Sequence, residues 1–141
     1  MAVMSGSPQY VGLVLVSHSA EIASGLAGLV GQVAGPEVPI AAAGGMPDGS
    51  FGTDGGRVLE VLRGAANGGG AGAVVLMDLG SSVLAVRAAL AELEPAELER
   101  IVVVDAPLVE GAVAAGVTAS TGADLAEVAE AAREARDVAK L

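Results

Sequence analysis

The chain has 141 residues and a formal net charge of −10; 52% of the residues are hydrophobic, yet Tyr10 and Phe51 are the only aromatic ones. This length suits one compact domain, whose core must be built from Ala, Val, Leu and Ile. The negative charge argues against nucleic acid or an anionic membrane as a partner, and the absence of cysteine excludes a disulfide framework and is typical of a cytoplasmic protein.

The apolar pattern alternates between short strand-like runs and helical spacings. Residues 1–10 are predicted to form a disordered tail and residues 11–141 a single domain. No basic residue precedes Arg57, so no signal peptide is expected, and no apolar run near the start is long enough to span a bilayer. In chain order, strands are predicted at 11–16, 38–43, 73–77 and 101–104, and helices at 20–33, from Thr53-Asp54 to the glycines at 68–70, at 83–93, at 108–119, and from Asp124 to about 140.

Such alternation predicts an α/β fold with three layers, α/β/α. The central sheet should be mainly parallel, with four to five strands joined by right-handed crossovers. Ligands of sheets of this kind bind at the carboxyl ends of the strands. Three unusual residues follow strand ends in this sequence: His18, Asp78 and Pro107.

His18 is the only histidine in the chain. One interpretation is structural, with the ring hydrogen-bonded at the end of a strand. The other is catalytic, because a neutral imidazole is a nitrogen nucleophile that works near neutral pH. The start of the next helix would also place free N–H groups beside His18, and such groups favour a bound phosphate.

Asp78 ends the third predicted strand and is followed closely by Ser81 and Ser82. The carboxylate either orders the local loop or accepts a hydrogen bond from one ring nitrogen of His18, which would leave the other nitrogen free to attack. Ser81 and Ser82 are expected to open the following helix, one of them as its N-cap. Their hydroxyl groups would serve equally as donors to a phosphoryl group.

Metal and nucleotide sites have little support in the sequence. One histidine and no cysteine argue against zinc, whereas magnesium held by Asp78 or Asp105 stays open although the spacing does not require it. Neither a P-loop nor a Rossmann glycine motif follows a strand. We therefore expect no metal and no cofactor, with any anion held by backbone N–H groups and hydroxyls.

Several short segments together resemble one family. They are GLVLVSHS at 12–19, AAAGG at 41–45, GTD at 52–54, MDLGS at 77–81, APLVEGA at 106–112 and STGADL at 120–125. In this order they resemble the DhaM subunits of dihydroxyacetone kinases that use the phosphoenolpyruvate phosphotransferase system. The likeness implies a fold similar to the IIA domain of mannose-type phosphotransferase permeases and a homodimer, which an apolar surplus in so small a domain also favours.

The resemblance implies a phosphotransferase with a phosphohistidine intermediate. His18 would be phosphorylated by the phosphocarrier protein HPr and would pass the phosphoryl group to ADP on a DhaL subunit, whose ATP phosphorylates dihydroxyacetone on DhaK. Asp78 matches the residue that supports the active histidine, and Ser81 or Ser82 the hydroxyl near the phosphate. The residues expected at the rim of the site are Thr53, Pro107, Leu108, Val109, Glu110 and Gly111.

Other functions fit the same residues. The chain could be a mannose-type IIA component that feeds a sugar permease, although the 107–111 segment favours DhaM. It could also be a non-catalytic module that binds a phosphate or nucleotide, or an interaction domain in which His18 is structural. Some DhaM chains continue into HPr-like and enzyme I-like domains, and whether this one does is left open.

Overall fold

The computed structural model describes residues 9–141. The disordered tail predicted at 1–10 therefore lies almost entirely outside the described residues. Tyr10, which is described, packs against the core, and its carbonyl oxygen accepts a hydrogen bond from the N–H of Ala71 at 3.3 Å. Packed structure thus extends one residue ahead of residue 11.

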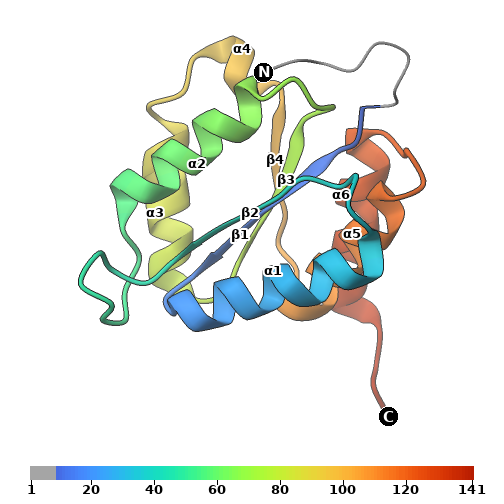
Figure 1. The fold of residues 1–141 in the computed structure, drawn as a ribbon, viewed down its shortest axis with the longest axis horizontal. Helices are drawn as coiled ribbons and strands as arrows, with labels where there is room; N and C mark the ends of the chain where they lie inside the picture. Colours follow the sequence, from blue (N-terminus) through green and yellow to red (C-terminus); the bar gives the residue numbers. More distant parts are fainter. Residues whose placement is uncertain (1–8) are drawn as a thin grey trace.

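The chain alternates strands and helices around one parallel sheet (Figure 1). The strands are β1 (Gly12–Ser17), β2 (Ile40–Gly44), β3 (Ala73–Met77) and β4 (Ile101–Val103), paired in the order β2-β1-β3-β4. The helices are α1 (Ala20–Ala34), α2 (Gly55–Asn67), α3 (Gly80–Leu90), α4 (Pro95–Leu98), α5 (Leu108–Ala119) and α6 (Leu125–Glu134), followed by the short 3₁₀ turn η1 (Ala135–Asp137). All the strand pairs are parallel, which confirms the predicted sheet.

Helices cover both faces of the sheet. Successive residues of a strand point to opposite faces, so a strand that is apolar throughout has side chains to bury on each face. In β1, Leu13 and Leu15 belong to the core formed with α1, α5 and α6, whereas Val14 and Val16 belong to the core formed with α2 and α3. Every residue of β1 is buried, as a parallel strand covered on both faces requires. The three-layer α/β/α prediction is therefore confirmed, and Figure 1 shows the two helix layers.

The helices differ from the prediction in several places. α3 spans Gly80–Leu90, so it begins and ends three residues earlier than the predicted 83–93. Pro95, two residues beyond the helix predicted at 83–93, is the first residue of the short helix α4, which was not predicted; at this position its missing N–H costs nothing. α6 ends at Glu134 instead of near 140, because no residue beyond Ala132 is fully buried and burial provides most helix stability in proteins.

The end of β2 lies against the start of α1. A Cβ atom at Gly44 would stand 2.5 Å from the carbonyl oxygen of Ser19, so only glycine permits this close approach. The contact brings the loop 45–53 beside the end of β1, where the N–H of Gly52 donates to the carbonyl oxygen of His18 at 2.9 Å. No helix in the described part of the chain is long and apolar enough to cross a bilayer.

Candidate active site

The carboxyl ends of the two central strands carry the candidate site. His18 follows β1 and precedes Ser19, the N-cap of α1, whose hydroxyl accepts the N–H of Ile22 at 3.2 Å. Asp78 follows β3, which pairs with β1. The side chains of His18 and Asp78 are 24% and 15% exposed, so the ring can be reached from solvent while the carboxylate is largely covered.

Asp78 holds the imidazole of His18 in one orientation. Nδ1 of His18 lies 2.9 Å from Oδ1 of Asp78, and the backbone N–H of His18 donates to Oδ2 at 3.0 Å. A carboxylate accepts only, so Nδ1 carries the proton and Nε2 keeps its lone pair. The hydrogen bond predicted between Asp78 and one ring nitrogen is therefore present, and Nε2 is the nitrogen left to react.

The carboxylate of Asp78 accepts an unusual number of hydrogen bonds. The donors are the hydroxyl groups of Ser17 (2.7 Å) and Ser82 (2.9 Å), the backbone N–H groups of His18 and Leu79, and the His18 ring. Burial raises the pKa of Asp78, but the hydrogen bonds from Ser17, His18 and Ser82 outweigh it and hold the pKa well below its ordinary value. The charge that orients His18 thus persists into strongly acidic solution.

Ser81 and Ser82 lie in the first turn of α3, and neither is its N-cap. The N-cap is Leu79, which has no side-chain cap bond, so the prediction of a serine cap is wrong. The hydroxyl groups turn toward the site instead: Ser81 Oγ contacts Nε2 of His18, and Ser82 Oγ lies 3.3 Å from Nδ1. Thr53 Oγ1 stands 2.9 Å from the buried Ser82 Oγ, which brings one predicted rim residue into the network.

Ser17 is the site residue that the sequence analysis missed. It is fully buried, and its hydroxyl donates to Asp78 Oδ2 while accepting the N–H of Ser19 at 3.0 Å. One hydroxyl thereby ties the end of β1, the start of α1 and Asp78 together. A serine at the end of an apolar strand carries no sequence signal of its own, although its place beside His18 could have drawn attention to it.

We expect Ser17→Ala to lower the free energy of unfolding by about 1–3 kcal/mol, because the buried N–H of Ser19 loses its acceptor. It should also raise the pKa of Asp78 toward its ordinary value of about 3.9, because Ser17 is the strongest of the donors that lower it. A lowered native-state pKa stabilises the fold above that ordinary value, and this stabilisation is lost as the pH falls toward the native-state pKa.

The deficit of Ser17→Ala should therefore stay constant from pH 7 down to the raised pKa of Asp78 in the variant, and should shrink only at lower pH, where the variant takes up a proton that the wild type does not. Denaturant unfolding of both proteins at pH 7 and through the acid range measures it. A deficit that does not change with pH would show that Ser17 contributes packing and the Ser19 bond alone.

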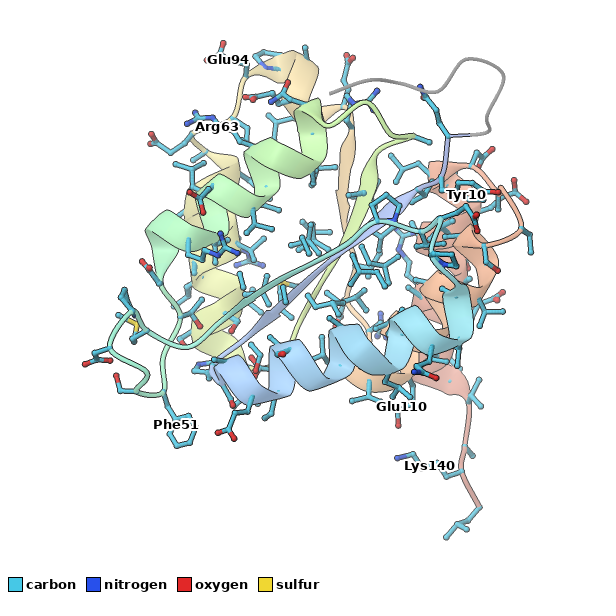
Figure 2. The ribbon with its side chains drawn as sticks, in the orientation of Figure 1. Tyr10, Phe51, Arg63, Glu94, Glu110 and Lys140 are labelled. Carbon is cyan, nitrogen blue, oxygen red and sulfur yellow. The ribbon has the colours of Figure 1, made fainter. Side chains whose placement is uncertain are left out.

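The rim residues predicted after β4 lie apart from this network. Pro107 is the N-cap of α5 and Leu108 packs against the core. Val109 and Glu110 line a hollow between α5 and α6, where Glu110 pairs with Lys140 at 2.8 Å. Figure 2 shows Glu110 beside Lys140 and far from Phe51, which marks the loop next to His18.

Acidic residues at this end of the sheet are engaged with protein groups. Asp105 pairs with Arg136 at 3.5 Å, and Asp78 accepts the hydrogen bonds described above. Within residues 9–141, no three His, Cys, Asp or Glu side chains are arranged to hold a metal ion.

Comparisons with known proteins identify the family of the chain. Residues 12–129 match the EIIA-man family model, described as the PTS system fructose IIA component. The PEP-dependent dihydroxyacetone kinase, phosphoryl donor subunit DhaM, of Pantoea ananatis is 40% identical over 128 residues, which are 89% of this chain and 27% of that protein. The phosphoryl donor subunit DhaM of the PEP-dependent dihydroxyacetone kinase 2 of Listeria innocua is 36% identical over 107 residues, which are 76% of this chain and 84% of that protein.

A solved structure also resembles this one. The crystal structure of EF1359, described as a protein of unknown function, matches with a TM-score of 0.76 and 33% identity, over 88% of this chain and 93% of that one. The chain thus spans about a quarter of the Pantoea ananatis relative, but most of the Listeria innocua relative and of the solved structure.

Proposed function

This chain belongs to the EIIA-man family and to its DhaM phosphoryl donor subunits, and we propose that it carries a phosphoryl group on Nε2 of His18. The group comes from phosphorylated HPr and passes to ADP held on a DhaL subunit, whose ATP then phosphorylates dihydroxyacetone on DhaK. The observation that supports this most directly is the hydrogen bond of 2.9 Å between His18 Nδ1 and Asp78, because it leaves Nε2 as the nucleophile.

In the first step, the lone pair of Nε2 attacks phosphorus and the bond from phosphorus to the donor's nitrogen breaks. The His18 ring gains positive charge as the new bond forms, and the carboxylate of Asp78 beside Nδ1 stabilises that charge. The hydroxyl of Ser81, which contacts Nε2 in the free protein, moves aside and donates to a phosphoryl oxygen. The N–H groups at the start of α3 favour the same negative charge.

In the second step, the phosphoryl group leaves His18 for one of two candidate acceptors, ADP or a sugar permease. The relatives are named as subunits of a dihydroxyacetone kinase, which favours ADP on DhaL over a sugar permease. We propose that the phosphoryl group is carried on His18 alone, with no metal or other cofactor of this chain, and that the transfer takes place in the cytoplasm, where phosphoenolpyruvate and ADP are formed.

A two-stage transfer assay tests this function. His18 is loaded with ³²P from phosphoenolpyruvate through enzyme I and HPr, and the purified phosphoprotein is mixed with DhaL·ADP or with a mannose-type permease and its sugar. The proposal expects the label to move to ATP in the first mixture and to stay on the protein in the second. Transfer to sugar alone would assign the chain to sugar uptake, and retention of the label in both mixtures would contradict a carrier role.

We also propose that the protein is a homodimer. α1 packs against α5, and both helices leave aliphatic side chains about half exposed: Leu29 and Val33 on α1 are 47% exposed, and Val109 and Val117 on α5 are 46% exposed. Large apolar side chains exposed on two packed helices are commonly covered by a partner. We expect light scattering at micromolar concentration to give twice the chain mass of 13.6 kDa; the mass of one chain would contradict the dimer.

A further inference from the structure

The hydroxyl group of Ser82 has three polar neighbours and only one proton. Ser82 is fully buried, and its Oγ lies 2.9 Å from Oδ1 of Asp78, 2.9 Å from Oγ1 of Thr53 and 3.3 Å from Nδ1 of His18. A hydroxyl donates one hydrogen bond and accepts up to two. The direction in which Ser82 points its proton therefore decides what the groups around the reacting ring receive.

Each direction of the Ser82 proton has a different consequence. Toward Asp78, it adds a donor to the carboxylate that orients His18. Toward Nδ1 of His18, it would favour the tautomer that carries its proton on Nε2, and Nε2 would then lack the lone pair that attacks phosphorus. Toward Thr53, it would leave a lone pair of Ser82 facing the carboxylate. Only the first direction serves the proposed reaction, and it is the one that the structure has.

The bond between Thr53 and Ser82 has a defined donor. Because the single proton of Ser82 goes to Asp78, Thr53 donates and Ser82 accepts. Among the described residues, Ser82 is also the one hydrogen-bond partner of Thr53 Oγ1. The hydroxyl of Thr53 thus donates to Ser82, whose hydroxyl donates to Asp78 at the same oxygen that His18 Nδ1–H contacts. Hydrogen bonds in such a chain polarise and strengthen one another.

The position of Ser82 in the first turn of α3 gives its hydroxyl a competing partner. Serine side chains in helices commonly donate to the carbonyl oxygen three or four residues earlier, which for Ser82 belongs to Leu79 or Asp78. Rotation of the Ser82 side chain toward that carbonyl would take its proton away from the carboxylate of Asp78. The bond from Thr53 opposes this rotation, because it requires the Ser82 oxygen to stay where it is.

Thr53 is itself held in place by its neighbours in the chain. Its backbone pairs with Gly45 in an isolated parallel bridge, and the next residue, Asp54, is the N-cap of α2. The side chain is β-branched, which restricts its rotamers. Thr53 therefore presents its hydroxyl to Ser82 from an ordered segment that follows β2, on a different element from the helix that carries Ser82.

We propose that Thr53 is a positioning residue of the phosphotransfer site: its hydroxyl holds Ser82 in the rotamer that donates to Asp78, and thereby keeps Nε2 of His18 free of a proton. The inference rests on the proposed function, since it concerns how ready Nε2 is to attack phosphorus. In this role Thr53 acts through Ser82, without touching the phosphoryl group.

Substitutions at Thr53 separate its hydroxyl from its shape. Thr53→Val keeps the branched shape and removes the hydroxyl, whereas Thr53→Ser keeps the hydroxyl. Thr53→Ala removes the hydroxyl with a smaller side chain and serves in place of the valine variant if that variant does not fold. Thr121→Val is the matched control, because Thr121 is exposed in the turn between α5 and α6, away from the site, and its hydroxyl donates to the carbonyl oxygen of Thr118 at 2.7 Å.

The test follows two properties of His18 in these proteins, in Ser82→Ala and in the double variant Thr53→Val/Ser82→Ala. The first is the rate of phosphorylation, with phosphorylated HPr and with phosphoramidate, which is small and needs no protein partner. The second is the tautomer of the ring, from its ¹⁵N chemical shifts in mildly alkaline solution. A thermal melt of each protein verifies that it is folded.

The rate with both donors should fall about threefold to tenfold in Thr53→Val, the effect of one lost hydrogen bond on the barrier. The tautomer protonated on Nε2 should become more populated in the same variant. Thr53→Ser and Thr121→Val should resemble wild type in both properties. Because Thr53 acts through Ser82, the valine substitution should add no further loss of rate to Ser82→Ala.

Two results would overturn the inference alone. A folded Thr53→Val protein with the rate and tautomer of wild type would show that Thr53 only joins its loop to α3. Losses of rate that add in the double variant would show that Thr53 acts by a route other than Ser82. In both cases the wild-type protein still accepts the phosphoryl group. A wild-type protein that neither donor phosphorylates on His18 would overturn the proposed function and this inference with it.

Discussion

Incubation with phosphoenolpyruvate, enzyme I and HPr should add one phosphoryl group to the wild-type chain and none to His18→Ala. The chain has a single histidine, and its Nε2 is the ring nitrogen not engaged by Asp78. The substitution should leave the fold in place, because the ring is a quarter exposed and Asp78 keeps the donors of Ser17, Ser82 and the backbone. Intact mass spectrometry and a thermal melt measure the two effects.

The chemistry of the bond provides the control for this experiment. A phosphohistidine is labile in acid and stable in base, whereas a phosphoserine behaves in the opposite way, and Ser81 and Ser82 both stand near the ring. The added mass should therefore disappear after brief acid treatment. A mass increase that persists in His18→Ala, or that resists acid, would assign the phosphoryl group to another residue.

The sequence predicted the fold well because its strands are buried on both faces. Runs such as 11–16 and 73–77 are apolar throughout, the pattern of a parallel strand between two helix layers, and the structure places β1 and β3 there. The position of His18 and Asp78 followed from the same reasoning, since neighbouring parallel strands end at one edge. The resemblance to DhaM subunits is likewise confirmed by the relatives.

What the sequence could not supply was the direction of short polar side chains. Ser81 and Ser82 have the composition of a helix cap, yet tertiary contacts with His18 and Asp78 take their hydroxyl groups and α3 begins ahead of them. Ser17 was missed because one buried hydroxyl does not alter an apolar pattern. The role of 107–110 at the rim came from the resemblance alone, and it stays a prediction, since Glu110 faces Lys140.

Asp78→Asn should slow the phosphorylation of His18 by about two orders of magnitude or more, which corresponds to roughly 1.4 kcal/mol of barrier for each factor of ten. The carboxylate accepts donors on both oxygens: His18 Nδ1, Leu79 and Ser82 on Oδ1, and Ser17 and the His18 N–H on Oδ2. An asparagine must turn its NH₂ group toward one of these sets, and an NH₂ cannot accept a hydrogen bond.

If the NH₂ faces Nδ1, the ring adopts the tautomer that protonates Nε2, and the nucleophile loses its lone pair. If it faces Ser17 and the backbone of His18, two buried donors lose their acceptor, at a cost of about 1–3 kcal/mol each, and the neutral amide oxygen no longer stabilises the charge that develops on the ring. Either orientation slows the reaction, and either lowers the free energy of unfolding, because an NH₂ group on the Oδ1 side leaves the N–H of Leu79 and the hydroxyl of Ser82 without their acceptor. The tautomer of the His18 ring, measured from its ¹⁵N chemical shifts, tells the two orientations apart.

Asp124→Asn is the matched control for this variant, because Asp124 is the N-cap of α6, away from the site, and asparagine caps helices as well as aspartate. Its phosphorylation rate and its melting temperature should both equal those of wild type. Phosphoramidate is a small phosphoryl donor that phosphorylates imidazole directly. The rate at which it phosphorylates His18 should fall in Asp78→Asn as the rate with HPr does, because the defect lies in the nucleophile and not in the docking of the donor. A folded Asp78→Asn protein that reacts at the wild-type rate with both donors would show that Asp78 only orders the start of α3, where it accepts the N–H of Leu79.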